Sequence, residues 1–333
     1  MSDTPTVKIT HGDTVIDCAP GETVLQAMLR AGIDTPYSCR NGMCLTCITR
    51  LVEGEVPSDS QIGIKDTLQA QGYFLPCVCE PTQDIGVAPP EPAEIFGRAV
   101  VTEVAHPSKN VCRVRLMPAT PLYYRAGQFI NIRRSDGLTR AYSLASVPSL
   151  DRYLELHVKR LPRGQMSNWF YEDLQPGEAV DIQGPNGSCF YIPDKKDQPL
   201  LLIGNGSGLS PLIGIARDAL NDGHTGPIHL YHGTRHQGGL YLDNLLRELA
   251  EEHDNLSYMP CLSREDTPET RRGRAEDVAL QDHAELAGYR VYLCGYPPMV
   301  RDMQRRAFMA GAALPDIYID PFELRDLRKK PRD

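Results

Sequence analysis

Four cysteines carry the clearest chemistry in this sequence: Cys39, Cys44 and Cys47 lie within nine residues, and Cys77 follows thirty residues later. Thiolates spaced C-x4-C-x2-C with one distant partner can surround a small inorganic core, which is the plant-type spacing for a [2Fe-2S] cluster. A structural zinc site usually pairs two short C-x2-C knuckles, and here only Cys44 and Cys47 have that spacing. The spacing therefore predicts an iron-sulfur electron centre with these four ligands.

The residues around these cysteines fit a tight loop. Gly42 lets the backbone pass close to inorganic sulfides, so that amide groups can point at them and help set the reduction potential. Cys79 stands two residues beyond Cys77, and because free cysteines are usually buried we expect a buried thiol there rather than a ligand. The stretch resembles the cluster loop of plant-type ferredoxins with one departure, because a small residue is usual in that family where Leu45 stands.

The composition is that of an ordinary globular protein. The chain has 333 residues, of which 41% are hydrophobic and 23% charged, and this length allows two or three domains with cores of their own. No apolar run approaches the roughly 18 residues of a membrane span, and the first residues lack a basic and apolar leader. We therefore expect a cytoplasmic protein without a membrane partner, in a compartment that keeps thiols reduced.

The negative charge is confined to the first part of the chain. Residues 1–95 hold 13 acidic and 5 basic side chains, whereas residues 96–333 hold 30 of each. An acidic surface around an electron centre can steer it toward a basic docking site in a salt-dependent way, or can simply keep the protein soluble. Neither part has the excess of basic side chains that nucleic-acid binding uses, so we expect no nucleic-acid partner.

The segment that carries the cysteines has the patterns of a small sheet with one helix. Alternating runs predict strands, and apolar residues at helical spacing, closed by Gly32, predict the helix. The expected strands are residues 7–10, 14–18 and 47–52, and the expected helix is residues 23–31. This order resembles the ferredoxin β-grasp fold. Three prolines within residues 88–93 favour extended backbone and predict a linker, so we assign residues 1–90 to the first domain.

We assign residues 96–194 to an antiparallel β-barrel. Short β-like runs separated by turn residues are typical of small barrels and sandwiches. The expected strands are residues 99–104, 111–116, 128–133, 141–146 and 153–159, with a turn at residues 184–187.

Side chains within this barrel segment could hold a flavin. Arg140, Tyr142 and Ser143 supply a guanidinium for a phosphate, a ring to pack on an isoalloxazine and a hydroxyl for its reactive nitrogen. A helix that begins near Gly164 and Ser167 would direct its free amides at a pyrophosphate.

We assign residues 198–323 to an α/β domain with a parallel sheet covered on both faces, because strands alternate with helices. A buried apolar run leads into a glycine-rich turn and a helix, the arrangement that receives a dinucleotide pyrophosphate. The turn supplies Gly204, Gly206, Ser207 and Gly208. We expect residues 324–333 to form a solvated tail.

The two later domains, with the cysteine loop before them, resemble the ferredoxin-NADP reductase superfamily. The resemblance implies that FAD is the flavin. The candidate flavin contacts are Arg140, Tyr142, Ser143, His157, Val158, Gly164, Met166 and Ser167, with Phe322 covering the flavin ring. The match C-G-x-P-P-M further implies that Cys294 and Gly295 lie beside the nicotinamide. Ser143 and Cys294 are the candidate catalytic residues.

The choice between NADH and NADPH depends on the end of the second strand of this domain. An acidic side chain there would bind the ribose 2′-hydroxyl of NAD, and a basic one would bind the 2′-phosphate of NADP. The sequence offers Arg235 and His236 and no carboxylate before Asp243. The resemblance to oxygenase reductases favours NADH, and Arg235 leaves NADPH open.

Residues 1 to about 323 resemble the reductase component of bacterial multicomponent oxygenases, with domains in the order ferredoxin, FAD, NAD. The resemblance implies electron transfer from NADH through FAD and the cluster to a separate Rieske or diiron oxygenase. The sequence has no E-x-x-H pair or 2-His-1-carboxylate spacing for activating oxygen itself. Two alternatives stay open: a reductase for a nucleotide-deoxysugar dehydratase, and a non-enzymatic redox carrier or sensor. We expect a monomer.

Overall fold

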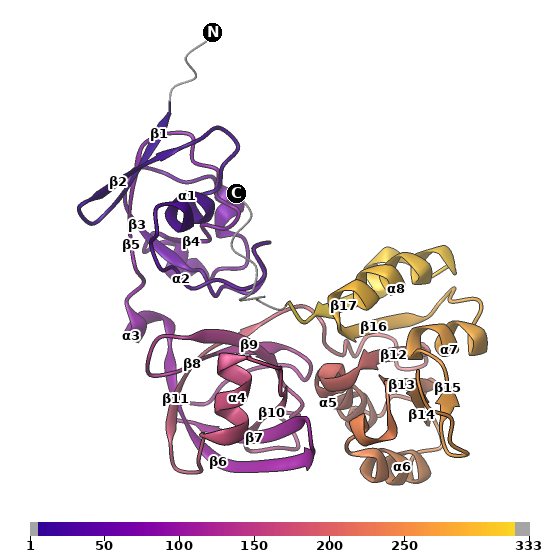
Figure 1. Ribbon diagram of the computed structural model, residues 1–333. Coiled ribbons are helices and arrows are strands. Elements are labelled where there is room, and N and C mark those ends of the chain that lie inside the picture. Colours follow the sequence, from indigo (N-terminus) through magenta and orange to yellow (C-terminus); the bar gives the residue numbers. More distant parts are fainter. Residues whose placement is uncertain (1–5, 324–333) are drawn as a thin grey trace.

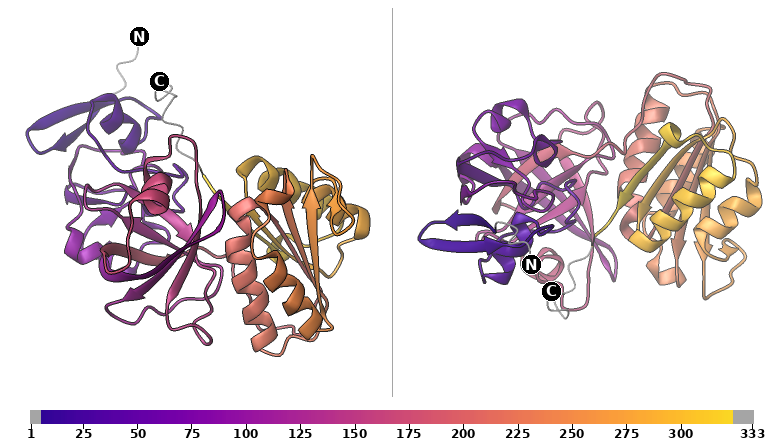
Figure 2. Two further views of the ribbon diagram at one scale, coloured as in Figure 1. Left: turned by 60° about the horizontal axis from the view of Figure 1, so that its bottom comes forward. Right: turned by 90° about the horizontal axis from the view of Figure 1, so that it is seen from above.

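The computed structural model describes residues 6–323, which fold into three units in chain order (Figure 1). One unit has a five-stranded sheet and the other two have six-stranded sheets. The first unit lies above the second, and the third lies beside the second, as two further views confirm (Figure 2). The expected multidomain architecture is confirmed, and the expected tail over residues 324–333 lies outside the described residues.

The first unit is a mixed sheet with strand order β2-β1-β5-β3-β4, in which β1 pairs antiparallel with β2 and parallel with β5. Helix α1 begins at a capping box, because the side chains of Thr23 and Gln26 each accept a hydrogen bond from the backbone amide of the other. The helix buries Val24, Ala27 and Met28 against the sheet. The elements are β1 Val7–His11, β2 Thr14–Cys18, α1 Val24–Arg30, β3 Thr49–Glu53, α2 Asp66–Gln69, β4 Tyr73–Phe74 and β5 Ile85–Ala88.

The proline-rich linker contains a turn of helix, α3 (Pro92–Ile95). Proline can begin a helix because the first helical position needs no N–H donor. Ile95 is buried in the core of the first unit, and the Tyr73 hydroxyl donates to Glu94 Oε2 at 2.5 Å and accepts from the Glu91 amide at 3.2 Å. The expectation of extended backbone is therefore wrong for this turn, and the linker is attached to the first unit.

The second unit is an antiparallel sheet with strand order β10-β7-β6-β11-β8-β9, closed by a bridge between Leu144 and Leu156. The sequence analysis missed β11 and expected a turn at residues 184–187. That expectation is wrong, because β11 continues to Asn186. Its pairing with β8 shifts register between Gln183 and Asn186, so the strand is irregular there but does not end. The elements are β6 Gly97–Ser108, β7 Val111–Pro118, β8 Phe129–Arg133, β9 Thr139–Ser143, β10 Leu154–Lys159, α4 Gln165–Glu172 and β11 Ala179–Asn186.

The third unit is a parallel sheet with strand order β15-β14-β13-β12-β16-β17. Helices α5 and α6 cover one face and α7 and α8 the other. Residues 200–203 of β12 can all be apolar because both faces of the strand are buried there. The elements are β12 Leu200–Asn205, α5 Leu209–Asn221, β13 Ile228–Thr234, α6 Asp243–Glu252, β14 Leu256–Leu262, β15 Arg271–Arg272, α7 Ala275–Asp282, β16 Arg290–Gly295, α8 Pro297–Met309 and β17 Ile317–Pro321.

Candidate functional site

The four cysteines expected to bind a cluster come together as two pairs of thiols. Cys39 is hydrogen-bonded to Cys44, and Cys47 is hydrogen-bonded to Cys77. Zinc needs four ligands around one point, whereas each iron of a two-iron core takes two protein ligands. The two pairs of thiols therefore suit a core of two irons.

Backbone amides of the loop point at these sulfurs. The amides of Cys44 and Asn41 lie 3.3 and 3.5 Å from Cys39 Sγ, and the amide of Cys39 lies 3.4 Å from Cys44 Sγ. Hydrogen bonds from Cys39 and Thr46 lower the pKa of the Cys44 thiol, against the effect of burial, while the same pairing raises the pKa of the Cys39 thiol. Such donors favour the thiolate, which is the form that binds metal.

Two residues give the loop its unusual backbone. Leu45 has a φ of +53°, which costs a side-chain-bearing residue about 1 kcal/mol, and its side chain is buried with Tyr37 and Ile48 in the core of the first unit. Gly42 has a φ of +81°, and a Cβ there would lie 3.3 Å from Val78. The departure at Leu45 thus anchors the loop in the core, while glycine suits the crowded turn at residue 42.

Of the three candidate flavin residues of β9, Ser143 lies at the boundary between the second and third units. The Ser143 hydroxyl donates to Asp320 Oδ2 at 2.5 Å, and the Ser143 carbonyl accepts from Ser210 Oγ at 3.1 Å. The Tyr142 ring packs edge-on against Phe170 of α4, with centroids 5.0 Å apart. Arg140 donates to the Thr139 carbonyl at 2.7 Å. Strand β9 and helix α4 thus form one continuous surface.

Helix α4 begins where the sequence analysis placed a pyrophosphate. Gly164 is its N-cap residue, and a Cβ at this position would lie only 2.4 Å from Ser167 Oγ. The Ser167 hydroxyl accepts from the Leu161 amide at 3.1 Å and lies 3.3 Å from the Gly164 carbonyl that it donates to. Met166 is buried in the barrel core. The G-x-x-S sequence therefore stabilises the turn that presents the first amides of α4.

The side chains of His157 and Val158 are engaged inside the protein. The His157 ring lies 3.1 Å from Glu155 Oε1 and 3.3 Å from the Tyr241 hydroxyl. Val158 belongs to the barrel core. A flavin contact at these two positions would therefore come from the backbone.

The glycine-rich turn after β12 touches the end of β16. A Cβ on Gly208 would lie 2.3 Å from the Cys294 carbonyl oxygen, and one on Gly204 would lie 2.7 Å from Leu212. Gly295 has a φ of +116° and lies against the backbone of Asn205. Only glycine permits this approach, which brings the expected pyrophosphate turn and the expected nicotinamide neighbours together.

Cys294 is completely buried, and its sulfur lies 3.7 Å from that of Cys189. Burial raises the pKa of the Cys294 thiol well above its usual value, so the thiol is neutral at physiological pH. Phe322, expected to cover the flavin, donates its backbone amide to the Gly295 carbonyl at 2.7 Å. The end of β17 is therefore attached to the same region.

Sequence analysis missed Asp320, whose carboxylate lies against Ser143. Burial raises the pKa of Asp320 to about 6, and the hydrogen bond from Ser143 only partly opposes this effect. Strand register places Asp320 beside Cys294. The only signal in the sequence is a carboxylate in the closing strand, two residues before Phe322.

A second missed carboxylate lies beside the loop that follows β13. Glu265 Oε1 lies 2.9 Å from His236 Nδ1, and Glu265 Oε2 accepts from the Gln237 amide at 2.5 Å. The sequence around the loop after β13 does not contain this carboxylate, because Glu265 belongs to the loop after β14. Lys159 approaches the same region, 3.2 Å from the position of a Cβ on Gly206. Burial, and then Arg235, lower the pKa of Lys159.

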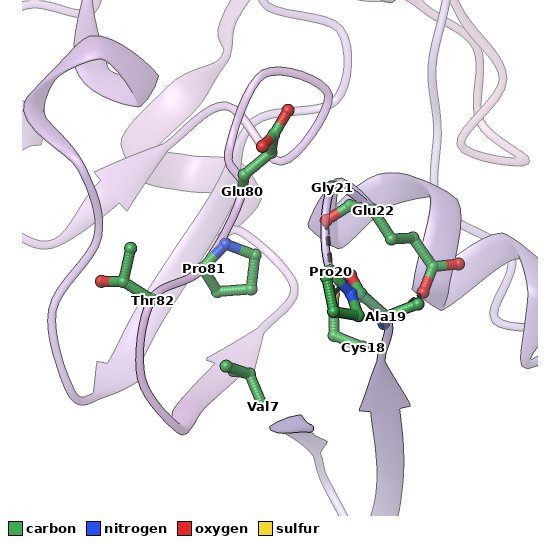
Figure 3. A pocket seen from close by; sticks show the side chains of 9 residues that line it. All are labelled: Val7, Cys18, Ala19, Pro20, Gly21, Glu22, Glu80, Pro81 and Thr82. Carbon is green, nitrogen blue, oxygen red and sulfur yellow. Dashed lines mark hydrogen bonds between the residues drawn. The ribbon is translucent and has the colours of Figure 1, made fainter. Parts of the chain in front are cut away.

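A hollow in the first unit is separate from this site (Figure 3). None of the candidate site residues lines it, and one of its two carboxylates, Glu22, is paired with Arg30 at 2.8 Å. The lining residues are Val7, Cys18, Ala19, Pro20, Gly21, Glu22, Glu80, Pro81 and Thr82.

Comparison with known proteins matches each unit to a domain family. Residues 7–82 match the 2Fe-2S iron-sulfur cluster binding domain, residues 98–191 the oxidoreductase FAD-binding domain, and residues 202–305 the oxidoreductase NAD-binding domain. The expected cofactor classes are therefore confirmed: a [2Fe-2S] cluster, FAD and a nicotinamide dinucleotide.

Relatives match across nearly the whole chain. The reductase subunit of an aromatic O-demethylase from Amycolatopsis is 38% identical over 89% of this chain and 92% of the relative. The reductase component of the naphthalene 1,2-dioxygenase system of Pseudomonas putida is 31% identical over 94% of this chain and 97% of the relative. The crystal structure of an Amycolatopsis cytochrome P450 reductase has a TM-score of 0.68 and 35% identity, covering 95% of this chain and 99% of the other.

The chain belongs to the reductase components of multicomponent oxygenases. This reductase is an FAD- and nicotinamide-binding oxidoreductase with a ferredoxin domain. Among residues 6–323, no helix is both long and apolar enough to cross a membrane.

The proposed cluster ligands can be tested by matched cysteine substitutions. Cys44→Ser should remove the visible absorbance of the cluster and most of the iron, because one ligand of the Cys39–Cys44 pair is lost. Cys79→Ser should keep both, because the Cys79 thiol is completely buried outside the two pairs. Iron analysis and absorbance spectroscopy of the purified proteins provide the measurement. Full iron content in Cys44→Ser, or equal loss in both variants, would contradict the assignment.

Proposed function

We propose that this reductase takes electrons from NADH and delivers them singly to a separate oxygenase component, and that it acts as a cytoplasmic monomer. The observation that carries the proposal is the position of the hairpin β8–β9. Asn131 of β8 contacts Cys44 in the cluster loop, and Ser143 of β9 contacts Asp320 in the third unit. One hairpin therefore joins the three cofactor regions, which is what electron transfer in series requires.

In this proposal β9 and the start of α4 hold FAD. When bound, FAD accepts a hydride from the nicotinamide and releases electrons one at a time, as a [2Fe-2S] cluster requires. Arg140 would pair with a phosphate, and Tyr142, fixed by Phe170, would pack on the flavin ring. The turn made by Gly164 and Ser167 would present the first amides of α4 to the pyrophosphate.

The nicotinamide would lie where the glycine-rich turn meets the end of β16. Gly204, Gly206, Ser207 and Gly208 would receive its pyrophosphate, and Cys294 and Gly295 would line the nicotinamide position. The Cys294 thiol is neutral and buried, so it would contribute shape rather than charge. We assign the catalytic hydrogen bond to the Ser143 hydroxyl, which Asp320 orients.

The proposed preference for NADH is supported by Glu265. Its carboxylate stands at the loop after β13, where an acidic group favours a ribose 2′-hydroxyl and repels a 2′-phosphate. Lys159 lies against Gly206 and interacts electrostatically with Arg235. In this proposal both side chains would meet the pyrophosphate that the two dinucleotides share.

The expected acceptor is an oxygenase component. The relatives named above are reductases of an aromatic O-demethylase and a naphthalene dioxygenase, which supports an oxygenase acceptor rather than a sugar dehydratase. The acidic excess in residues 1–95 would favour a basic docking face on that partner.

Rapid anaerobic mixing with NADH tests the function directly. We expect the flavin absorbance to bleach first and the cluster absorbance to follow, because the cluster receives its electrons from the flavin. Stopped-flow absorbance at flavin and cluster wavelengths provides the measurement. A protein that binds NADH without either change would be a carrier or sensor and would contradict the proposal.

Asp320 should give flavin reduction a pH dependence. Its pKa is about 6, so below pH 6 the carboxyl group is protonated and the Ser143 hydroxyl loses its charged acceptor. We expect the rate of flavin reduction to fall as the pH drops through 6 in the wild type. Asp320→Asn should remove this inflection and lower the rate at pH 8 by about tenfold, the lower end of the scale of a lost charged hydrogen bond. The rate of flavin reduction is measured by stopped flow from pH 5 to 8. An unchanged inflection in the variant would exclude Asp320 as its source.

Glu265 should set the preference between the two dinucleotides. We expect kcat/KM for NADH to exceed that for NADPH, and Glu265→Gln should reduce the ratio by about tenfold, because it removes a charge that repels the 2′-phosphate. Glu269→Gln makes the same change on an exposed residue of the same loop and should leave the ratio unchanged. Equal ratios in all three proteins would show that Glu265 does not discriminate.

A further inference from the structure

Asn131 is a polar side chain with no exposed surface, in a strand whose flanking residues face a hydrophobic core. Ile130 and Ile132 point into the barrel, so Asn131 points to the opposite face because side chains alternate along a strand. That face is covered by the cluster loop of the first unit, since Asn131 contacts residues 85 and 87 positions earlier in the chain.

Every polar atom of the Asn131 side chain has a partner. Its Nδ2 group donates to the Cys44 carbonyl at 2.7 Å and also to Gln183 Oε1 on the neighbouring strand β11. Its Oδ1 atom lies 3.4 Å from the Thr46 hydroxyl, which donates to it. These partners belong to two units of the protein, and all of them are buried. The network therefore fixes the loop relative to the barrel.

The peptide that Asn131 holds is the one that shapes the cluster loop. The Cys44 carbonyl directly precedes Leu45, whose φ is +53°. A hydrogen bond to this carbonyl fixes the orientation of the peptide group between a proposed ligand and the left-handed residue. Asn131 thus acts on the loop from outside its own unit.

The same position lies next to the candidate flavin residues. In the register of β8 and β9, Asn131 is paired with Ala141, which stands between Arg140 and Tyr142. Ala141 and Ser143 share a face because they are two residues apart in a strand. On β8, Arg133 shares the face of Asn131, and its guanidinium lies over the ring of Phe96 in the linker, 5.1 Å from the centroid. The cluster loop and the linker therefore contact the face of the hairpin that carries Asn131 and Ala141. The side chains of Arg140 and Tyr142 point to the other face, because they pair with Ile132 and Ile130.

We propose that Asn131 is a positioning residue that seats the cluster loop on the flavin-binding barrel and so sets the rate at which electrons cross from the flavin to the cluster. Asn131 acts through its hydrogen bonds to the Cys44 carbonyl, Thr46 and Gln183. The inference rests on the proposed assignment of the four cysteines as cluster ligands.

Asn131→Asp provides the sharpest test, because it keeps the size of the side chain and replaces the donor to the Cys44 carbonyl by a second acceptor. Asn131→Leu, of similar size and without polar atoms, is the second variant in case the first does not accumulate. Asn110→Asp, in the exposed turn between β6 and β7, makes the same chemical change away from the interface.

Hydrogen exchange of the holoprotein gives a readout that is independent of activity. In both Asn131 variants we expect amide exchange across residues 39–47 to accelerate about tenfold, as the loss of one buried hydrogen bond implies. Stopped-flow absorbance should show flavin reduction by NADH unchanged and cluster reduction slowed by about tenfold. Iron content should be that of the wild type, and Asn110→Asp should match the wild type throughout.

Each other outcome is decisive. Wild-type exchange and wild-type cluster reduction in the Asn131 variants would overturn the proposal, and so would slowed cluster reduction without faster exchange in the loop. Loss of iron from both Asn131 variants would assign the residue to cluster retention and would also overturn it. Wild-type protein without iron would instead overturn the cysteine assignment on which the inference rests.

Discussion

Buried polar groups in proteins need hydrogen-bond partners, and in this reductase two such groups on one hairpin take their partners from other units. The Asn131 amide donates to the Cys44 carbonyl of the first unit, and the Ser143 hydroxyl donates to Asp320 of the third. An unpaired group at either position would cost about 1–3 kcal/mol. The hairpin β8–β9 therefore favours one arrangement of the three units, with the barrel between the other two.

The arrangement matches the different ways in which the three cofactors handle electrons. Gly208 and Gly295 allow the nucleotide turn to touch the end of β16, beside the strand β17 that carries Asp320. Ser143 stands across that boundary, on the strand that also carries Arg140 and Tyr142. In the proposed function, the nicotinamide would meet the flavin where the second unit contacts the third, and the cluster would lie where the second unit contacts the first.

The parts of this protein that sequence could predict depend on local patterns. Short stretches of sequence are enough to predict three features. These are the spacing of four cysteines, the periodicity of strands and helices, and the strand-turn-helix context of Gly204 and Gly208. Sequence could not reveal β11, because Gly184 and Pro185 are typical of a turn, whereas the strand is held by distant partners β6 and β8. The helical turn at Pro92 was hidden for the same reason, since its packing depends on Tyr73.

Residues that act through tertiary contacts cannot be identified from the sequence around them. Asp320 and Glu265 are ordinary carboxylates in the sequence, and only strand register and loop packing bring them to Ser143 and His236. In the sequence, Asn131 is a polar residue in an alternating strand, a pattern that predicts an exposed side chain. The first unit instead buries it completely. The pairing of the four thiols also depends on how the loop meets Cys77, which spacing alone does not specify.

We propose that the four thiols hold two irons and receive electrons from a flavin bound in the same chain. The most direct measurement is metal, acid-labile sulfide and flavin analysis of wild-type protein isolated without oxygen. We expect about two irons, two sulfides and one FAD per chain, as a plant-type [2Fe-2S] flavoprotein requires. Zinc in place of iron, or no iron at all, would contradict it.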